Sequence, residues 1–589
     1  MDQPDPVPMN RTPALSHFLL LIALAGLFYF AGLGTLGLTD RDEGSNAEAA
    51  REMVETGNWM SPTLNYEPRF AKPAFTYWLM SAAYLLFGVN EFSARLHAAL
   101  FGLLLVLLQY LFVARTQDRW NGLAAALMLA LNLEMVAINR MALTDSVLIF
   151  FTTLSLYGFW WGLYGEGRTR RAIWLFYVGM GFATLTKGPV GLLVPLVAAG
   201  AFLTATRRWR DYRAHGRPFA GFILTAMLTI PWYAGMLWLH GANYSASAQA
   251  DTVGRFLNPI GGHGGTIFFY LPVLLLGFFP WSGWFVLSFI QTLKHWWAER
   301  RAGLDQTADA GPSASVPSLE AFAAWWCLSV VIFFSLSATR LPHYIGPMFP
   351  AAAILAAGLW RRSLDQADSP GAKAAMHLTT ILGYLLAIGL ASAPYLYETF
   401  LSQVEKEFPM AGTATPGLGP VAAGGVLLIG TSLAGYFGRS ETRRAGMLWV
   451  MACSLGAVIL ILLHVTGPRF QQLFIGPPQQ LAAIAGLNLG PNDRFVTYGP
   501  HKPSWIFYAR RKTIVIRPGE EDKLTPYLSL PGRTIILLPT RLKSKLPKET
   551  ESYEVLLAHG GYSLLANEAM VKLPARSPES EPPRMPPGH

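Results

Sequence analysis

Long apolar stretches alternate with short polar loops along most of the chain. A helix that crosses a bilayer core about 30 Å thick needs roughly 20 apolar residues, and fewer where flanking side chains reach the interface. Thirteen stretches approach that length: 18–36, 96–113, 123–138, 147–163, 174–185, 190–203, 220–239, 268–289, 321–336, 345–359, 378–396, 421–436 and 448–465. The pattern therefore predicts an α-helical polytopic membrane protein with about thirteen transmembrane helices.

The composition supports a membrane protein and argues against other classes. Of the 589 residues, 52% are hydrophobic and 14% are charged, whereas charged residues make up about 25% of typical soluble domains. The net charge of +10 does not indicate nucleic-acid binding, because the basic residues are spread through short loops between apolar stretches. Cys327 and Cys453 lie inside apolar stretches and are expected to pack, with no disulfide and no metal site.

The distribution of Lys and Arg predicts the orientation in the membrane. One set of alternate loops is rich in these residues: 115–119, 168–171, 207–217, 294–301, 361–373 and 439–444. Loops of this kind face the cytoplasm. With an odd number of spans, the chain is expected to begin inside and end outside; in a bacterial inner membrane the sparser loops would then face the periplasm.

Two of the outward loops, 39–72 and 240–266, are long enough to carry a functional site. In the first, Asp42 is a plausible helix cap and Gly57 a plausible helix end. Apolar residues between them form a stripe, which predicts a helix along the membrane surface: Ala47, Ala50, Met53 and Val54. The aromatic segment 75–87 is expected to be a second interfacial helix.

The pattern divides the chain into three parts. Residues 1–466 are expected to form the transmembrane domain, with a periplasmic loop at 39–94. Short apolar runs at 494–498, 513–516 and 534–538 alternate with Gly and Pro turns, which predicts a small periplasmic α/β domain over 467–573. Residues 574–589 are expected to be a disordered tail, and 308–318 a second disordered stretch.

Ionisable residues at the outer ends of the predicted helices are the candidate site. Placing an ionisable side chain within the membrane costs free energy, so each such residue is expected to have a partner or a functional role. Under the predicted topology several of them fall on one side of the membrane: Asp42, Glu43, Lys72, Asp145, Lys187, Arg255, Arg340 and Tyr344, with His263 in a glycine-rich loop. Carboxylates can activate an acceptor and cations can hold a departing phosphate, so the group predicts transfer from a phosphate-linked substrate.

Each residue alone also has an ordinary structural explanation. Asp42 and Asp145 are well placed to cap the helices that they open. Lys72 and Arg340 could extend to the interface as snorkelling side chains. His263 could be a loop residue without a role. Capping alone does not predict clusters of cations beside the carboxylates, and this clustering favours a site.

An ordered set of motifs resembles the aminoarabinose transferase and protein O-mannosyltransferase group of GT-C membrane glycosyltransferases. The motifs include Asp42-Glu43 with Glu48 and Arg51-Glu52, Gly57-Asn58-Trp59, Lys72-Pro73 with Tyr77-Trp78, Phe87-Gly88 with Glu91-Phe92 and Arg95-Leu96, Leu143-Thr144-Asp145, Thr186-Lys187-Gly188-Pro189, Gly254-Arg255-Phe256, Pro280-Trp281, Phe334-Ser335-Leu336-Ser337 and Leu341-Pro342-His343-Tyr344. The resemblance extends through the tenth predicted span. It implies an inverting sugar transfer from a polyprenyl (undecaprenyl) phosphate carrier on the periplasmic face.

The resemblance also implies residue roles. Asp42 matches the essential carboxylate of the first loop and Asp145 the second functional carboxylate, while Lys72, Arg255 and Tyr344 match positions that contact the carrier phosphate. One departure is Ala71, where the aminoarabinose enzymes tend to have Glu before Lys-Pro. The sugar and the acceptor, lipid A or another envelope component, therefore stay open.

Two other functions and the cofactor question complete the expectations. A protein O-mannosyltransferase would share the donor and differ in its protein acceptor. A lipid or solute transporter is the alternative from another class, but it should place charges near mid-membrane and contain an inverted repeat, and no such repeat is found in the sequence. No cofactor is expected, a divalent metal is left open, and the oligomeric state is not indicated.

Overall fold

The computed structural model describes residues 11–165, 167–258, 265–301, 316–366, 369, 371–415, 417–440 and 443–567. His263, the predicted tail 574–589 and most of the stretch 308–318 lie outside the described residues. The chain divides into two compact units. The helical unit comprises residues 1–401 and 415–472, and the α/β unit comprises residues 402–414 and 473–589.

The helical unit is built from long helices joined by short connections. Its helices are α1 (Leu15–Ala25), α2 (Asp42–Thr56), α3 (Phe75–Phe87), α4 (Glu91–Thr116), α5 (Arg119–Ala130), α6 (Leu133–Ile138), α7 (Asp145–Tyr164), α8 (Ile173–Lys187), α9 (Pro189–Ala205), α10 (Trp209–His215), α11 (Pro218–Gln249), α12 (Arg255–Leu257), α13 (Tyr270–Gly277), α14 (Ser282–Arg301), α15 (Leu319–Leu336), α16 (Phe349–Asp365), α17 (Ala372–Ala391), α18 (Ala393–Thr399), α20 (Gly419–Arg439), α21 (Arg444–Ile461) and α22 (Gly467–Phe470).

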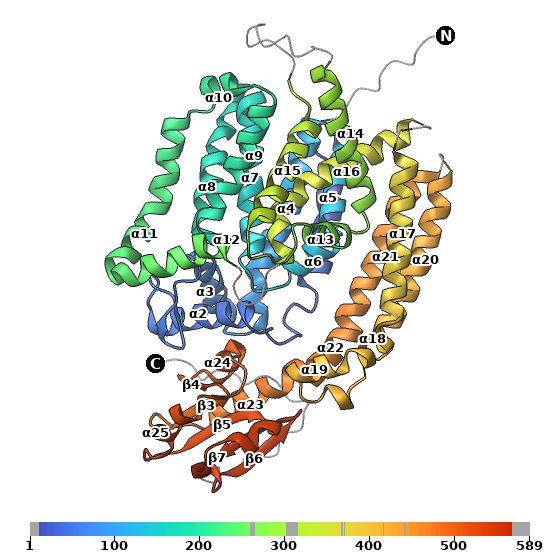
Figure 1. Ribbon diagram of the computed structural model, residues 1–589. Coiled ribbons are helices and arrows are strands. Elements are labelled where there is room, and N and C mark those ends of the chain that lie inside the picture. The colour runs from blue at the N-terminus through green and yellow to red at the C-terminus, as the bar shows by residue number, and fades with distance from the viewer. Residues whose placement is uncertain are drawn as a thin grey trace, which may run out of the picture. The chain divides into compact units, whose positions relative to one another are not determined.

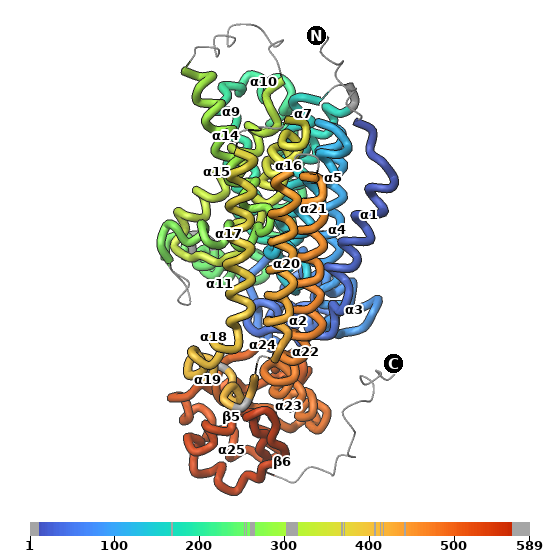
Figure 2. The backbone as a smooth tube through the Cα atoms, turned by 90° about the vertical axis from the view of Figure 1, so that its right-hand side faces the viewer, coloured from blue at the N-terminus to red at the C-terminus, as the bar shows by residue number. Residues whose placement is uncertain are grey.

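Shorter elements connect these helices. They include the π-helical turns η1 (Gly26–Phe30), η3 (Ala250–Gly254), η8 (Leu462–Thr466) and η9 (Gln471–Ile475), the 3₁₀ turns η2 (Gly167–Ala172) and η5 (Pro342–Met348), and a hairpin of β1 (Thr63–Leu64) and β2 (Glu67–Pro68). Figure 1 shows α2 and α3 at one end of the long helices α7, α8 and α9, and α10 at their other end; Figure 2 agrees. The arginine-rich loop around α10 therefore lies opposite the predicted site loop.

Seven helices in the described part of the chain are long and apolar enough to cross a membrane. They are α4, α7, α11, α15, α17, α20 and the run Arg444–Leu487 that begins with α21. Three shorter apolar helices cover Leu15–Phe30, Phe75–Phe87 and Pro189–Ala205. The protein is therefore an integral membrane protein of helical type, while the count of thirteen spans stays a prediction.

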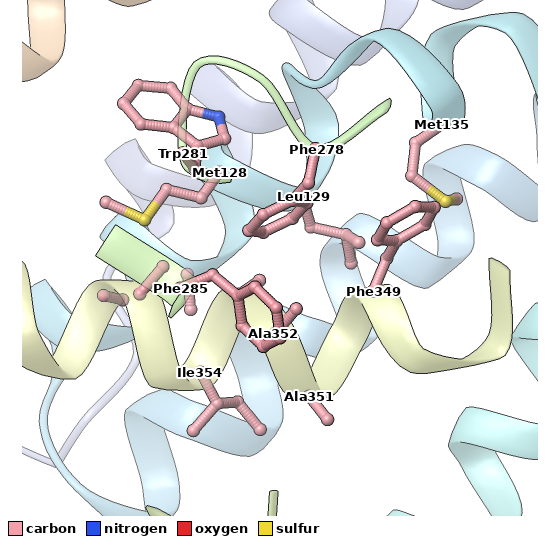
Figure 3. Packing of buried hydrophobic residues seen from close by; sticks show 14 of the residues in the cluster. Met128, Leu129, Met135, Phe278, Trp281, Phe285, Phe349, Ala351, Ala352 and Ile354 are labelled. Atoms are coloured by element: carbon pink, nitrogen blue, oxygen red, sulfur yellow. The ribbon is translucent and has the colours of Figure 1, made fainter. Parts of the chain in front are cut away.

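Small and aromatic side chains fill the core between the helices. Figure 3 shows Phe278 and Phe349 close to Leu129 of α5, and their rings stack with centroids 5.5 Å apart. The indole of Trp281 donates a hydrogen bond to the carbonyl of Leu131 at 2.7 Å, which satisfies its N–H group inside the core. Several alanines of α16 are buried in this core, and small residues let helix backbones approach closely in many membrane helix interfaces.

Helix α2 differs from the amphipathic helix that the sequence predicts. Every residue from Glu43 to Met53 is buried, including several charged ones. The N-cap position is occupied by Arg41, so Asp42 lies in the first turn and does not cap. Gly57 ends the helix in the left-handed conformation with φ of 68°, which glycine adopts readily. A helix with charges buried on several sides needs ion-pair partners, and Glu43 and Glu48 have them in Arg95 and Arg51.

The α/β unit has one mixed sheet. Its strands are β3 (Arg494–Tyr498), β4 (Thr513–Ile516), β5 (Thr534–Pro539), β6 (Glu554–His559) and β7 (Tyr562–Ala566), in the order β4-β3-β5-β7-β6. The first three pair in parallel, and β5, β7 and β6 pair antiparallel. Helices of this unit are α19 (Leu401–Glu407, whose first residue belongs to the helical unit), α23 (Gly476–Leu487), α24 (Pro503–Ala509) and α25 (Thr525–Leu528), with 3₁₀ turns η6 (Ala411–Thr413), η10 (Glu521–Lys523), η11 (Thr540–Lys545) and η12 (Lys548–Thr550).

Both faces of this sheet are covered. Ile535 and Leu537 of β5 pack in one apolar cluster with Trp505 of α24, while Ile536 and Leu538 pack in a second cluster on the opposite face. Successive side chains of a strand point to opposite faces. An uninterrupted apolar strand such as β5 is therefore stable only between two layers.

Candidate functional site

A polar cavity forms where five segments of the helical unit meet at the end that carries α2. The cavity is small and partly open to solvent. Its lining comes from the start of α2, the loop before α3, the start of α7 with the two residues before it, the end of α8 and the start of η5 with its N-cap: Asp42, Asn46, Lys72, Leu143, Thr144, Asp145, Lys187, Leu341, His343 and Tyr344. Five residues proposed from the sequence, Asp42, Lys72, Asp145, Lys187 and Tyr344, thus come together.

Asp145 and Lys187 form a buried ion pair in this cavity. The Lys187 amine donates to Oδ1 of Asp145 at 2.6 Å, and the two side chains are only 10% and 5% exposed. Thr144 takes the N-cap position of α7, so Asp145 lies in the first turn, where the helix dipole also favours a negative charge. The structure therefore gives Asp145 a charged partner in place of the capping role that it could have had.

The end of α8 fixes the position of Lys187. Lys187 is the last residue of α8, Gly188 follows with φ of 71°, and Pro189 opens α9. Glycine permits this turn and proline suits the first helical position. The amine also lies 4.8 Å from the ring centroid of Tyr344, within the range of a cation–π contact. Lys187 is thus held by a carboxylate and an aromatic face.

His343 is a cavity residue that the sequence did not single out as a ligand. Its Nε2 lies 4.0 Å from Oδ2 of Asp145. Burial lowers the pKa of His343 below its ordinary value of 6.5, although the Asp145 carboxylate opposes this effect. The imidazole is therefore neutral at neutral pH and can both donate and accept a hydrogen bond. The Leu341-Pro342-His343-Tyr344 motif was the available signal.

Asp42 and Lys72 complete the cavity from the first loop. The Asp42 side chain is exposed, whereas Lys72 is partly buried. With Asp145 and Lys187 they give the cavity two carboxylates and two amines. Asn46, one turn after Asp42, also lines it and donates to the carbonyl of Ala142 at 3.1 Å. This polar cluster can hold a phosphate and accept a proton in the same space.

Other proposed residues lie elsewhere. Glu43 is buried beside Arg95 and is not among the lining residues. Arg340 lies in the loop that follows α15 and donates to the carbonyls of Gly265 and Ser335. It is not among the residues that line the cavity. Arg255 opens α12, but its side chain lies outside what the structure describes, as does His263. Their roles toward a substrate stay predictions.

Carboxylates and a histidine lie close enough in the cavity to raise the question of a metal site among the residues that the structure describes. That part of the chain contains no group of three or more His, Cys, Asp or Glu side chains arranged to hold an ion. Asp42, Asp145 and His343 line one cavity, yet Asp145 is already paired with Lys187.

The fold is that of a GT-C membrane glycosyltransferase. Superposition on the crystal structure of ArnT from Cupriavidus metallidurans bound to undecaprenyl phosphate gives a TM-score of 0.73 at 23% identity, covering 94% of this chain and 99% of that one. The apo state of the same protein gives 0.72 at 22% identity. The profile of dolichyl-phosphate-mannose-protein mannosyltransferases matches residues 18–243.

Sequence relatives define the family more closely. The chain is 33% identical over 408 residues to the undecaprenyl phosphate-alpha-4-amino-4-deoxy-L-arabinose arabinosyl transferase of Pseudomonas paraeruginosa, and the match covers 68% of each protein. It is 32% identical over 351 residues to the transferase of the same name from Pseudomonas aeruginosa, covering 58% of this chain and 59% of that protein. The chain belongs to this ArnT-like family of glycosyltransferases. The resemblance stated from the motifs is confirmed.

Proposed function

We propose that the protein transfers a sugar from undecaprenyl phosphate to an envelope acceptor such as lipid A, in the cavity described above and on the periplasmic side of the membrane. The observation that carries the proposal is the grouping of Asp42, Lys72, Asp145 and Lys187 around one cavity at the ends of apolar helices. Membership of the arabinosyl transferase family supports the donor class. A cavity at the ends of these helices suits a carrier lipid whose phosphate lies at the level of the headgroups and whose polyprenyl tail lies in the bilayer.

The proposed reaction is a single displacement. Asp42 accepts the proton of the acceptor hydroxyl, whose oxygen forms a bond to the anomeric carbon of the sugar. The bond between that carbon and the phosphate oxygen breaks, and the electron pair leaves with undecaprenyl phosphate. Asp42 suits the role of base because its carboxylate is exposed to the cavity, so an acceptor can approach it.

The cations act on the leaving phosphate in this scheme. Lys72 and Lys187 line the same cavity, and charge-assisted bonds from amines stabilise the negative charge that develops as the phosphate departs. Asp145 orients Lys187 through the 2.6 Å contact and is a positioning group in this scheme. Tyr344 contributes its ring beneath the amine. Arg255 is proposed as a further phosphate ligand from the resemblance.

A second candidate function is protein O-mannosyl transfer. It is favoured by the match of the mannosyltransferase profile to residues 18–243. This range contains the loop with Asp42 and Lys72, so it bears on the donor half of the reaction. The two candidates share the displacement chemistry and differ in the acceptor. Ala71, in place of the Glu that is usual before Lys-Pro in the aminoarabinose enzymes, leaves the sugar open.

Mass spectrometry of the cell envelope tests the proposal. Lipid A and periplasmic glycoproteins from cells with and without the protein are compared. A sugar increment on lipid A that depends on the protein is the expected result, and an increment on proteins would favour the second candidate. No change in any lipid, glycan or glycoprotein of the envelope would contradict the proposed function.

Loss of the Lys72 amine should weaken donor binding. In Lys72→Ala the dissociation constant of undecaprenyl phosphate is expected to rise by about tenfold, because a charge-assisted bond contributes roughly 1.5 kcal/mol or more. Arg69→Ala is the control: it removes a cation from the same loop, which in the structure binds the hydroxyl of Tyr77 at 3.2 Å and does not line the cavity. Equal affinities of wild type and Lys72→Ala, measured in nanodiscs, would remove Lys72 from the site.

A further inference from the structure

One buried ion pair ties together the segments that carry the two cavity carboxylates. The Arg95 guanidinium donates to Glu43 through Nε at 2.6 Å and through a terminal nitrogen at 2.9 Å. The Arg95 side chain is 6% exposed and the Glu43 side chain 1% exposed. Such a two-point contact between a guanidinium and a carboxylate fixes the orientation of both groups.

Arg95 also holds the chain that leads into α2. Its terminal nitrogens donate to three backbone carbonyls, those of Leu33 at 3.0 Å, Leu36 at 2.6 Å and Gly37 at 2.9 Å. These residues lie just before the first turn of α2, where Asp42 sits. Arg95 belongs to α4, so the entry to the first loop is fixed to a long helix of the unit.

Glu43 connects this entry to the start of α7. Its carboxylate accepts from the amide and hydroxyl of Thr39, at 2.8 and 2.9 Å, and from the amide of Ala142 at 2.8 Å. Ala142 stands three residues before Asp145. The carbonyl of Ala142 accepts from Asn46 at 3.1 Å. Side chains of α2 therefore bind both the amide and the carbonyl of Ala142.

The carboxylate charge is needed for these contacts. Burial alone would raise the pKa of Glu43, but the Arg95 guanidinium and the surrounding N–H donors outweigh burial and hold it below its ordinary value. Glu43 therefore stays ionised at periplasmic pH. Five donor contacts converge on its two oxygens, and a glutamine amide would turn an NH₂ group toward donors.

We propose that Glu43, oriented by Arg95, is a positioning residue that sets the separation of Asp42 and Asp145 across the cavity. This inference rests on the proposed function, in which Asp42 is the base and Asp145 orients the Lys187 amine. It places Glu43 outside contact with the donor, although the sequence predicts it among the residues of the site. A displacement of about 1 Å in such a pair can lower turnover about 10²-fold.

The test uses the full-length protein in nanodiscs, with Glu43→Gln, Arg95→Lys and both changes together. Undecaprenyl phosphate alone is the binding probe, and its stoichiometry counts the folded sites. Turnover uses undecaprenyl phosphate-linked 4-amino-4-deoxy-L-arabinose, or the sugar found by the envelope comparison. Glu48→Gln is the matched control, because Glu48 is a buried carboxylate of the same helix that pairs with Arg51 at 2.7 Å and does not line the cavity.

The expected result is a split between turnover and binding. Turnover per binding-competent site should fall about 10- to 100-fold in each single variant, with donor KM and the affinity for undecaprenyl phosphate within about threefold of wild type. The double variant should lose no more than the worse single variant, because the two residues act as one unit. Glu48→Gln should keep its turnover per site. A merely structural role would reduce the number of sites and leave turnover per site unchanged.

Several outcomes would overturn the inference. Turnover per site within threefold of wild type in both single variants would do so, and so would a tenfold loss of undecaprenyl phosphate affinity, which would make Glu43 a donor ligand. If neither variant folds, Glu43→Asp carries the test: it keeps the charge but is one methylene shorter, and normal turnover per site would overturn the inference. Absence of transfer by the unaltered protein overturns the proposed function and this inference with it.

Discussion

The two cavity carboxylates differ in environment, and the difference separates their roles. The Asp145 side chain is buried and paired with Lys187, whereas Asp42 is exposed to the cavity. The Lys187 amine already occupies Oδ1 of Asp145, whereas the exposed Asp42 can be approached by an acceptor hydroxyl in the cavity. At the scale of single residues, the proton acceptor is therefore proposed to be Asp42.

Asp42→Asn is expected to lower transfer by about 10² to 10⁴-fold, the usual contribution of a general base. The fold should be unaffected, since Asp42 is not the N-cap of α2 and asparagine is nearly the same size. Asp40→Asn, two residues earlier and outside the lining residues, is the control. Near-normal transfer by Asp42→Asn, with product measured by mass spectrometry, would show that the base lies elsewhere.

Glu52 predicts a pH dependence of stability. Its carboxylate accepts from the hydroxyl of Thr63 and the amide of Tyr66, and so anchors the β1–β2 hairpin. Burial raises the pKa of Glu52 from 4.5 to about 7. The folded protein thus binds a proton there more readily than the unfolded chain. This contribution to stability is complete below about pH 4.5 and is lost as the pH rises to about 7.

Glu52→Gln, a neutral substitute, should therefore be more stable relative to wild type at pH 8 than at pH 5. We expect the difference in Tm to grow by about 2 °C or more between the two pH values. Glu55→Gln, near the exposed end of the same helix with its side chain 49% exposed, serves as the control. The same Tm difference at both pH values would contradict the assignment.

The site residues were predicted mainly from motifs, and what could not be predicted is which charged residues pair with each other. Five of the proposed residues line one cavity, but the sequence could not show that Glu43 turns away from it. The Glu43 partner is Arg95, 52 positions later, and no local pattern reveals a contact at that separation. Asp145 and Lys187 are likewise 42 positions apart. Charged residues in one loop look alike until the fold pairs some of them.

Among the secondary-structure elements, apolar segments were the most predictable. Helix α3 spans the expected segment Phe75–Phe87, and β3 and β4 span the expected runs 494–498 and 513–516. Helix α2 was predicted as a helix, but its burial on several sides was not. A prediction from amphipathic spacing assumes that one face of the helix is exposed to solvent, whereas α2 buries Glu48 and Arg51 as an ion pair.

The α8–α9 hairpin depends on a glycine at its helix contact. A Cβ at Gly191 would lie 2.1 Å from the carbonyl carbon of Ala183 on α8, whereas nothing lies within 4 Å of a Cβ at Gly200 on the same helix. Gly191→Ala should therefore separate the helices and destabilise the protein by about 1 to 3 kcal/mol. Because Lys187 ends α8, donor turnover should fall as well.

Gly200→Ala is the matched control for this contact. It adds the same methyl group where there is space, and alanine has the higher helix propensity, so its Tm should equal or slightly exceed that of wild type. The test compares the Tm values of both variants and wild type in the same detergent. Equal stability of Gly191→Ala and Gly200→Ala would show that α8 and α9 do not pack as closely as the structure indicates.

At the scale of the whole molecule, the topology is the main open prediction. The asymmetry of Lys and Arg predicts that the loop 207–217 is cytoplasmic and that the chain after Val465 is outside. An alkaline phosphatase fusion after Val465 should be active and one within 207–217 inactive. The reverse pattern would contradict both the orientation and the periplasmic placement of the cavity.

Sugar transfer by the purified protein tests the central claim most directly. The protein, reconstituted in liposomes with lipid A, is supplied with undecaprenyl phosphate-linked sugars, and the release of undecaprenyl phosphate is followed together with the sugar on the acceptor. The account predicts that wild type releases undecaprenyl phosphate and transfers the sugar in equal amounts. Both should persist in EDTA, because the cations Lys72 and Lys187 line the cavity and can stabilise the leaving phosphate without a metal. Both should be lost in Asp42→Asn. Loss in EDTA with recovery on adding one divalent ion would show a metal requirement. Failure of wild type to consume any such donor, under conditions where a related arabinosyl transferase does, would contradict the account.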